Sequence, residues 1–231
     1  MIDAVLFDLD GTLLENDMQR FMRHYLRALA SRLAHLIPPA QFAEQLMTAT
    51  DRMIENPHPN ETNQQAFWRE FEQVTGLSEK ELSPILDDFY TNEFSALRVC
   101  TRSRPEARPL VETVINLGRQ AVLATNPLFP MKAIRHRMEW AGIDDLPFAL
   151  ITSYEHFHSC KPYPAYFQEV AERIGVAPAR CLMVGDDMKM DGPARDAGMQ
   201  LFWVIQEEPF TRERGSLTHL HALLLDGLLD K

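Results

Sequence analysis

The chain has 231 residues, of which 45% are hydrophobic and 24% charged, a composition that suits one large core or a core with a small second domain. Its formal net charge of -10 argues against an electrostatic grip on nucleic acid or on an anionic membrane. No segment approaches the roughly 20 consecutive apolar residues that a membrane span needs. We therefore expect neither a nucleic-acid partner nor a membrane partner.

The chain begins with a short apolar run, Ile2–Phe7, which predicts a buried strand and stops at Asp8. The run is not preceded by the basic segment of a signal peptide. Cys100, Cys160 and Cys181 are sparse and show no CxxC spacing, which is typical of proteins in a reducing compartment. Together these features predict a soluble, cytoplasmic protein.

Residues 16–96 show helical periodicity and no convincing strand. One apolar stripe marks the first helix of this segment: Met18, Phe21, Met22, Tyr25, Leu29, Leu33 and Leu36. Ser78, with a glutamate three residues later, has the spacing of a capping box, and a loop rich in Pro and Asn, Glu55–Thr62, divides the segment. We expect an all-helical domain at 16–96, inserted after the first strand into a core domain formed by 1–15 and 97–231.

From residue 97 onward, short apolar runs alternate with helical patterns. The predicted strands are Gln120–Ala124, Phe148–Ile151, Cys181–Val184 and Leu201–Ile205. The predicted helices are Arg108–Leu117, Tyr163–Ile174 and Asp191–Ala197, each followed by a glycine that can end a helix in a left-handed conformation. Short strands that are apolar on both faces predict a parallel sheet covered on both sides. The expected fold is α/β, a Rossmann-like doubly wound parallel sheet with an all-helical cap domain inserted after the first strand.

Polar residues follow several of the predicted strands. In an open parallel sheet, ligands bind beyond the carboxyl ends of the strands. The residues that follow the strands are Asp8 and Asp10 after the first, Thr125 and Asn126 after the second, Lys161 in the loop after the third, and Asp186, Asp187 and Asp191 after the fourth. We expect these side chains to form a carboxylate cluster with one hydroxyl and one ammonium group.

These motifs, in this order, make the sequence similar to the haloacid dehalogenase (HAD) superfamily, in the branch whose helical cap is inserted after the first motif. The motifs are Val5-Leu6-Phe7-Asp8-Leu9-Asp10-Gly11-Thr12-Leu13, Ala124-Thr125-Asn126, Lys161-Pro162 with Pro164 and Phe167, and Val184-Gly185-Asp186-Asp187 through Asp191 to Ala197-Gly198-Met199. The resemblance covers the core, about two thirds of the chain, and the insert matches only in position and type. It implies a phosphoric monoester hydrolase.

The resemblance also implies a division of labour among these residues. Asp8 would attack phosphorus and form an aspartyl-phosphate, and Asp10 would act as general acid and then base. Mg²⁺ would be held by Asp8, the backbone carbonyl of Asp10 and Asp186, because hard oxygen ligands suit this ion. Thr125 and Lys161 would bind the phosphoryl oxygens.

Several residues have alternative interpretations. Asn126 binds the substrate phosphate or holds its turn, and Asp187 is a second metal contact or a helix N-cap. Asp191 orients Lys161 or a metal-bound water. His156, His158 and Cys160 alternate along the chain and could suggest a trio of metal ligands, but no fourth ligand is evident. Arg20, Arg23 and Arg27 form a basic helix face that is either solvated or in contact with an anionic substrate.

The leading functional hypothesis is a phosphatase that acts on a small phosphorylated metabolite, with the helical insert as a lid that excludes water. Dehalogenating members of the family lack an acid/base at the position of Asp10, so this residue favours phosphoryl transfer. A phosphomutase of the same family would use the same aspartyl-phosphate. A signalling receiver domain fits less well, because its phosphorylated Asp follows the third strand. Tyr163 stands where the third motif often has an Asp, which we expect to leave Lys161 in its role.

Overall fold

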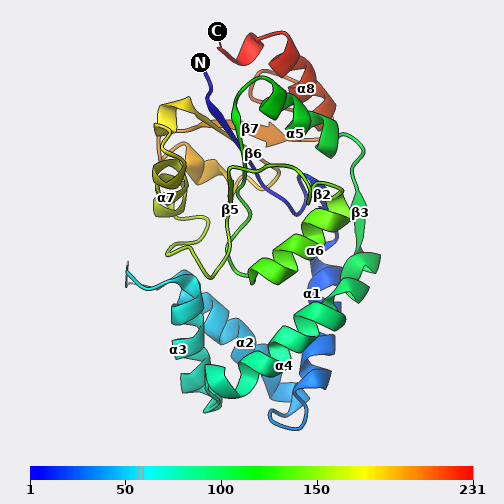
Figure 1. The fold of residues 1–231 in the computed structure, drawn as a ribbon, viewed down its shortest axis with the longest axis vertical. Helices are drawn as coiled ribbons and strands as arrows, with labels where there is room; N and C mark the ends of the chain where they lie inside the picture. Colours follow the sequence, from blue (N-terminus) through cyan, green and yellow to red (C-terminus); the bar gives the residue numbers. More distant parts are fainter. Residues whose placement is uncertain (57, 59, 231) are drawn as a thin grey trace.

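The computed structural model of the chain describes residues 1–56, 58 and 60–230. One end of the molecule is a six-stranded parallel sheet with the strand order β5-β4-β1-β6-β7-β8, and the other end is a group of helices (Figure 1). The strands of this sheet are β1 Ala4–Phe7, β4 Gln120–Leu123, β5 Leu150–Ile151, β6 Cys181–Gly185, β7 Gln200–Val204 and β8 Arg214–Gly215. The predicted α/β fold with a parallel sheet is therefore confirmed.

Strand β1 lies inside the sheet between β4 and β6, and all four of its residues are fully buried. Because side chains alternate across a strand, Val5 and Phe7 pack into one hydrophobic cluster while Ala4 and Leu6 pack into another. This two-sided burial explains why the sequence of β1 is uniformly apolar.

Helices cover both faces of the sheet. Their bounds are α5 Ala107–Asn116, α6 Met131–Ala141, α7 Pro164–Ile174 and α8 Leu217–Leu225. Helices α5, α6 and α8 contribute to the cluster that contains Phe7, and α7 contributes to the cluster that contains Leu6. Short 3₁₀ helices complete this part of the chain: η2 Pro178–Arg180, η3 Gly192–Ala194 and η4 Leu228–Asp230.

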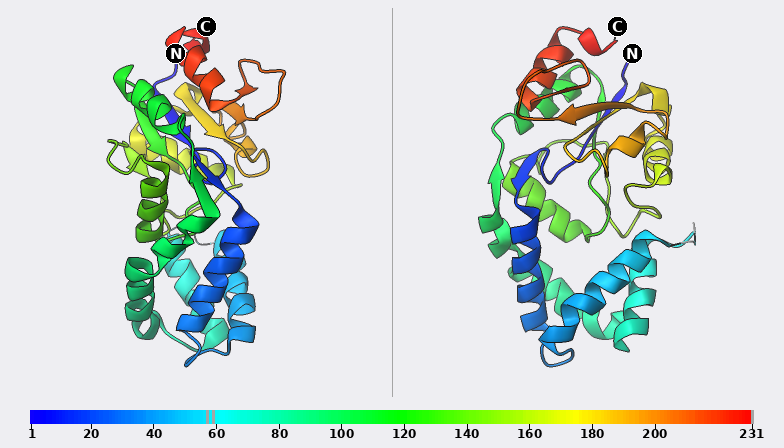
Figure 2. Two further views of the ribbon diagram at one scale, coloured as in Figure 1. Left: turned by 90° about the vertical axis from the view of Figure 1, so that its right-hand side faces the viewer. Right: turned by 180° about the vertical axis from the view of Figure 1, so that it is seen from behind.

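Four helices form the opposite end of the molecule, as the two further views in Figure 2 also show. They are α1 Met18–Arg32, α2 Pro39–Ile54, α3 Asn63–Thr75 and α4 Glu79–Asn92, followed by the 3₁₀ helix η1 Phe94–Cys100. The chain enters this group through β2, Leu14–Asn16, and leaves it through β3, Thr101–Ser103, which pairs antiparallel with β2. The predicted capping box at Ser78 opens α4. The division of the chain into domains at 1–15 with 97–231 and at 16–96 stays a proposal.

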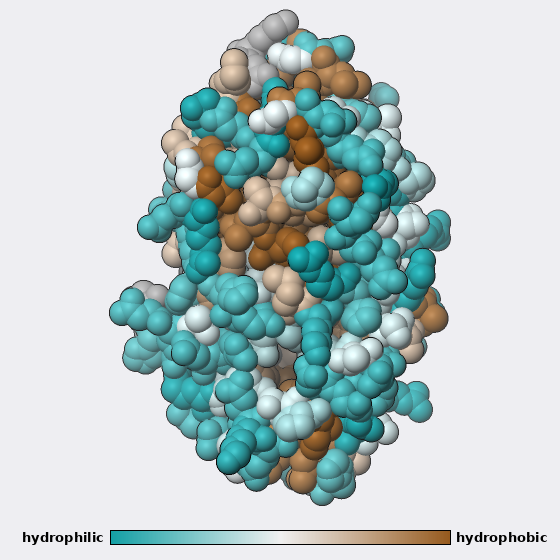
Figure 3. Space-filling view, in the orientation of Figure 1, coloured by the Kyte–Doolittle hydropathy of each residue, from teal (hydrophilic) through white to brown (hydrophobic). Residues whose placement is uncertain are grey.

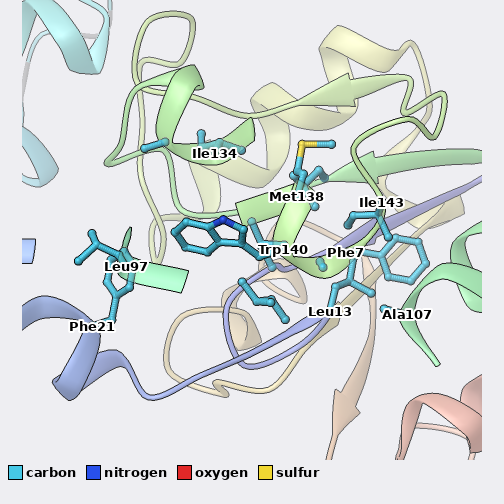
Figure 4. Packing of buried hydrophobic residues seen from close by; sticks show 14 of the residues in the cluster. Phe7, Leu13, Phe21, Leu97, Ala107, Ile134, Met138, Trp140 and Ile143 are labelled. Carbon is cyan, nitrogen blue, oxygen red and sulfur yellow. The ribbon is translucent and has the colours of Figure 1, made fainter. Parts of the chain in front are cut away.

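A single hydrophobic cluster runs from the helical end into the layer beside the sheet. Trp140 of α6 lies between Leu97 and Phe21 on one side and Leu13 and Phe7 on the other (Figure 4). The helical group and the layer beside the sheet therefore share one continuous hydrophobic core.

The structure differs from the sequence-based expectation in a few places. The predicted helix Asp191–Ala197 is wrong: the segment contains only the 3₁₀ helix η3, since Gly192 and Pro193 are poor residues for an α-helix interior. The short strands β2, β3 and β8 were not predicted. The loop expected at 55–62 separates α2 from α3, and its residues 57 and 59 lie outside the described residues.

The surface seen in Figure 3 is largely hydrophilic, with an apolar area over the sheet end of the molecule. Within residues 1–56, 58 and 60–230, none of the helices has both the length and the apolar character needed to cross a membrane.

Candidate active site

Several of the residues predicted to meet at the carboxyl edge of the sheet lie close together in the structure. Asp8 follows β1, Thr125 closely follows β4 and Asp186 follows β6, and these three strands are neighbours in the sheet. Lys161 reaches the same place from the loop between β5 and α7. The peptide bond between Lys161 and Pro162 is cis. All of these side chains except that of Pro162 line one cavity.

Lys161 is the centre of this cluster. Its ammonium group donates hydrogen bonds to Asp8 Oδ1 at 2.8 Å and to Asp191 Oδ1 at 2.6 Å. Burial alone would lower the pKa of Lys161, but the two carboxylates outweigh it and raise that pKa above its usual range. Lys161 is therefore held as a buried cation between Asp8 and Asp191, and its contact with Asp191 favours the orienting role over the other role considered for Asp191.

Three carboxylates converge beside this cation. One oxygen of each of Asp8, Asp186 and Asp191 lies within 4.8 Å of the others. Burial raises the pKa of Asp8 to about 8, although Lys161 opposes the shift. Burial also raises the pKa of Asp186, against a hydrogen bond of 3.0 Å that Thr12 Oγ1 donates to its Oδ1. Such a set of close, partly desolvated oxygen donors fits a hard divalent cation such as Mg²⁺.

Two glycines allow the carboxylates to approach the backbone this closely. A Cβ on Gly11 would lie 2.3 Å from Asp186 Oδ2, and a Cβ on Gly185 would lie 2.0 Å from Asp191 Oδ2. Gly11 also has a φ of +94°, a conformation that other residues rarely adopt. The glycine in the first motif is thus required by both the turn and the space that Asp186 occupies.

Asp10 lies apart from the three clustered carboxylates. Its Oδ1 accepts a hydrogen bond of 2.8 Å from Asn16 Nδ2, and its Oδ2 forms an ion pair with Arg137 Nη1. Arg137 is 1% exposed, and its guanidinium group lies 4.6 Å from the ring centroid of Phe129. The side chain of Asp10 is therefore fixed from two sides at the edge of the cavity.

Sequence reasoning missed Arg137. The residue lies on α6, where Ile134, Met138 and Ala141 are also buried. Arg137 lies three residues after Ile134 and directly before Met138, so it falls within the apolar stripe of this helix. This pattern can be seen in the sequence. Such a placement indicates a buried partner, which here is Asp10.

The other predicted residues have clear positions. Thr125 is buried and lines the cavity, and its backbone carbonyl accepts a hydrogen bond from Tyr166 Oη at 2.9 Å. Asn126 Oδ1 accepts a hydrogen bond of 3.1 Å from the backbone N–H of Lys161, so this side chain ties together the two loops that carry Thr125 and Lys161. Of its two interpretations, the geometry favours holding the turn.

Asp187 is exposed, and its Oδ1 accepts hydrogen bonds from the backbone N–H groups of Lys189 at 2.8 Å and Met190 at 3.3 Å. This geometry favours a cap of the local turn over a metal contact. In the histidine–cysteine trio, His158 Nδ1 lies 2.8 Å from Glu169 Oε1. The basic face of α1, which contains Arg20, Arg23 and Arg27, is exposed and lies outside the residues that line the cavity.

The cavity has a volume of about 660 Å³ and lies between the cluster and the four helices α1–α4. The start of α3 is hydrogen-bonded to loops at the sheet end of the molecule. Asn63 is fully buried there, and its Nδ2 donates to the backbone carbonyls of Pro127 and Ser159, both at 3.3 Å. These two carbonyls belong to the loops that carry Asn126 and Lys161, so the helical group contacts the site loops directly.

Comparisons with known proteins agree with this geometry. The family model described as haloacid dehalogenase-like hydrolase matches residues 2–197. The chain is 25% identical over 241 residues to YhcW of Bacillus subtilis, provisionally named a phosphatase, covering 99% of this chain and 98% of that protein. It is 26% identical to the phosphoglycolate phosphatase of Xylella fastidiosa, over 85% of this chain and 77% of that protein. The crystal structure of a HAD phosphatase from Thermococcus onnurineus has the same fold, with a TM-score of 0.60 and 20% identity, over 96% of this chain and 98% of that one.

Proposed function

We propose that this chain, a phosphoric monoester hydrolase that belongs to the haloacid dehalogenase-like hydrolase family, hydrolyses a small phosphorylated metabolite through an aspartyl-phosphate on Asp8. The observation that carries the proposal is the arrangement of Asp8, which is hydrogen-bonded to the buried Lys161 and lies in one cluster with Asp186. A nucleophilic carboxylate next to a fixed cation and further oxygen donors is the arrangement that attack on a phosphate dianion requires.

In the first step, a carboxylate oxygen of Asp8 forms a bond to phosphorus while the bond from phosphorus to the leaving oxygen breaks. Asp10 donates its proton to that leaving oxygen, and the alcohol departs. The contacts from Asn16 and Arg137 fix the position of the Asp10 carboxyl group beside the cavity. Lys161 and the Thr125 hydroxyl would bind the phosphoryl oxygens, on which charge gathers in the transition state.

In the second step, Asp10 accepts a proton from a water molecule, whose oxygen attacks the phosphorus of the aspartyl-phosphate. The acyl phosphate bond breaks, inorganic phosphate leaves and Asp8 is regenerated as a carboxylate. A lid formed by the helices would exclude other water from the intermediate, and the hydrogen bonds from Asn63 to both site loops support this arrangement.

The carboxylates of Asp8 and Asp186 and the backbone carbonyl of Asp10 would hold Mg²⁺. When bound, the ion would neutralise charge on the phosphoryl group and so allow one anion to approach another. Asp191 would contribute by holding Lys161, and Asp187 by capping its turn. A cytoplasmic location stays an expectation from the sequence.

The test is phosphate release from a panel of phosphorylated metabolites, measured with Mg²⁺ and with a chelator. Wild-type protein should release phosphate only with Mg²⁺, and Asp8→Asn should remain folded but lose turnover. Asp144→Asn, an exposed substitution on the same sheet domain, is the matched control and should keep full activity. Undiminished phosphate release from Asp8→Asn would refute the nucleophile assignment. A requirement for a bisphosphorylated activator would instead indicate the phosphomutase.

A further inference from the structure

The part of the cavity that faces α1–α4 is mainly apolar. Its walls include Met22, Tyr25, Leu46, Phe67, Trp68 and Leu86. The aromatic side chains pack against one another, with ring centroids 5.4 Å apart for Phe67 and Trp68. Because this wall lines the same cavity as Asp8 and Lys161, we place the leaving group of a phosphate ester bound at the cluster against it.

Every basic side chain in this cavity already has an acidic partner. Among the described residues that line the cavity, three are basic. Lys161 is bound by Asp8 and Asp191, Arg137 by Asp10, and the third, Lys132, by Asp87. Among the described residues of the lining, no basic side chain is therefore without an acidic partner.

Acidic groups, in contrast, outnumber the basic ones in the lining, with eight acidic residues against three basic ones. Glu79 and Asp87 of α4 and Glu155 of the sheet end lie away from the carboxylate cluster. Glu155 Oε1 accepts a hydrogen bond of 2.8 Å from the backbone N–H of Met131, whereas its Oε2 is buried and has no hydrogen-bond partner among the described residues. A second anion on the substrate would be desolvated next to like charges, without a cation to compensate it.

We infer that the substrate is the phosphate monoester of an uncharged, predominantly apolar alcohol, and that esters with a second anionic group are rejected. The inference rests on the proposed phosphatase function and adds the chemical class of the leaving group. The apolar wall favours a ring or a branched hydrocarbon, and Glu155 Oε2 can accept a hydrogen bond from one hydroxyl of such a group. The preference for uncharged leaving groups over anionic ones comes from the lack of an unpaired basic side chain in the described lining as much as from the apolar contacts.

The inference is tested by steady-state kinetics with Mg²⁺ on three esters: benzyl phosphate, 4-carboxybenzyl phosphate and phosphoglycolate. The first two have closely similar leaving oxygens and differ in one remote carboxylate. We expect kcat/KM to be at least about tenfold higher for benzyl phosphate than for either carboxylate ester. Equal values, or a preference for a carboxylate ester, would overturn the substrate class while leaving the phosphatase intact. No hydrolysis of any ester, together with none in the metabolite panel, would overturn both.

A cation placed in the wall should relax this discrimination. Met47 lines the cavity and is 40% exposed, so Met47→Lys can be introduced without burying a charge fully. We expect this variant to narrow the ratio of kcat/KM between benzyl and 4-carboxybenzyl phosphate by about threefold or more. Leu117→Lys is the matched control, because Leu117 is 44% exposed and lies outside the cavity lining. An identical narrowing in both variants, or none in Met47→Lys while its circular dichroism is unchanged, would contradict the inference.

Discussion

Replacing Lys161 with methionine should destabilise the metal-free protein strongly, because it leaves two buried carboxylates without their shared cation. The side chains of Lys161 and Asp191 are 1% and 2% exposed, and that of Asp8 is 13% exposed. Breaking a buried ion pair by removing one partner costs about 3–5 kcal/mol. Protonation of Asp8, whose pKa is already raised to about 8, limits the cost near neutral pH. We therefore expect a loss of about 3–4 kcal/mol in the free energy of unfolding.

Urea unfolding in the presence of a chelator measures this loss, and thermal unfolding should show a fall in Tm of about 6–16 °C for a chain of this size. Lys132→Met is the matched control. Its ion pair with Asp87 joins α6 to α4, but the two side chains are 49% and 63% exposed. An exposed pair is worth at most about 1 kcal/mol, so the control should change stability far less.

A double variant separates the charge effect from the loss of packing. Adding Asp191→Asn to Lys161→Met removes the carboxylate that has become uncompensated, so the double variant should recover part of the lost stability. The reasoning is refuted if Lys161→Met costs less than about 1 kcal/mol, or if Asp191→Asn destabilises the wild type and the Lys161→Met variant equally.

Three further predictions concern other parts of the molecule. Burial raises the pKa of Tyr25 to about 12, so the folded state keeps a proton that the unfolded state loses near pH 10, and stability falls between these values by up to about 1.4 kcal/mol per pH unit. Tyr25→Phe should therefore make the decline of urea-unfolding midpoints between about pH 10 and pH 12 shallower. Arg137→Met should lower kcat at least about tenfold with a smaller change in KM, since Asp10 loses its ion pair. Arg137→Lys should keep a higher kcat than Arg137→Met but a lower one than the wild type. Asn63→Ala should raise KM several-fold, because each lost hydrogen bond to the site loops is worth about 0.5–1.5 kcal/mol.

Each of these predictions has an outcome that would contradict it. If the urea-unfolding midpoints of the wild type and of Tyr25→Phe fell equally with rising pH, the buried phenol of Tyr25 would not control the pH dependence of stability. Full kcat in Arg137→Met would show that Asp10 needs no fixed position. An unchanged KM in Asn63→Ala would show that contacts between α3 and the site loops do not influence substrate binding.

The central strands and the residues that follow them could be predicted from the sequence because their local pattern is strong. β1 and β6 are continuous apolar runs buried on both faces, and the polar residues at their ends stand out against them. In contrast, β2 and β3 have three residues each and are partly exposed, and they pair across the whole helical insert. No local periodicity marks so short a strand, and its partner is distant in the chain.

The positions of the candidate site residues were predictable only where a sequence motif marks them. Lys161 was identified because it precedes a proline in a motif, but its contact with Asp191 depends on Gly185, whose missing side chain makes room for that carboxylate. The sequence analysis missed Arg137, and its partner Asp10 lies 127 residues away in the sequence. The residues of the cavity wall could not be predicted from the sequence either, because they depend on the relative positions of four helices.

The distribution of cations in the site bears on where a metal would bind. Lys161 compensates Asp8 and Asp191, and Arg137 compensates Asp10. Asp186 receives a hydrogen bond from the Thr12 hydroxyl, but among the described residues no basic side chain pairs with it. The nearby carboxylates of Asp191 and Asp187 raise its pKa further, after burial itself. Among the carboxylates of Asp8, Asp10, Asp186 and Asp191, only that of Asp186 thus has no basic partner among the described residues, and this imbalance supports our proposal that Mg²⁺ binds between Asp8 and Asp186.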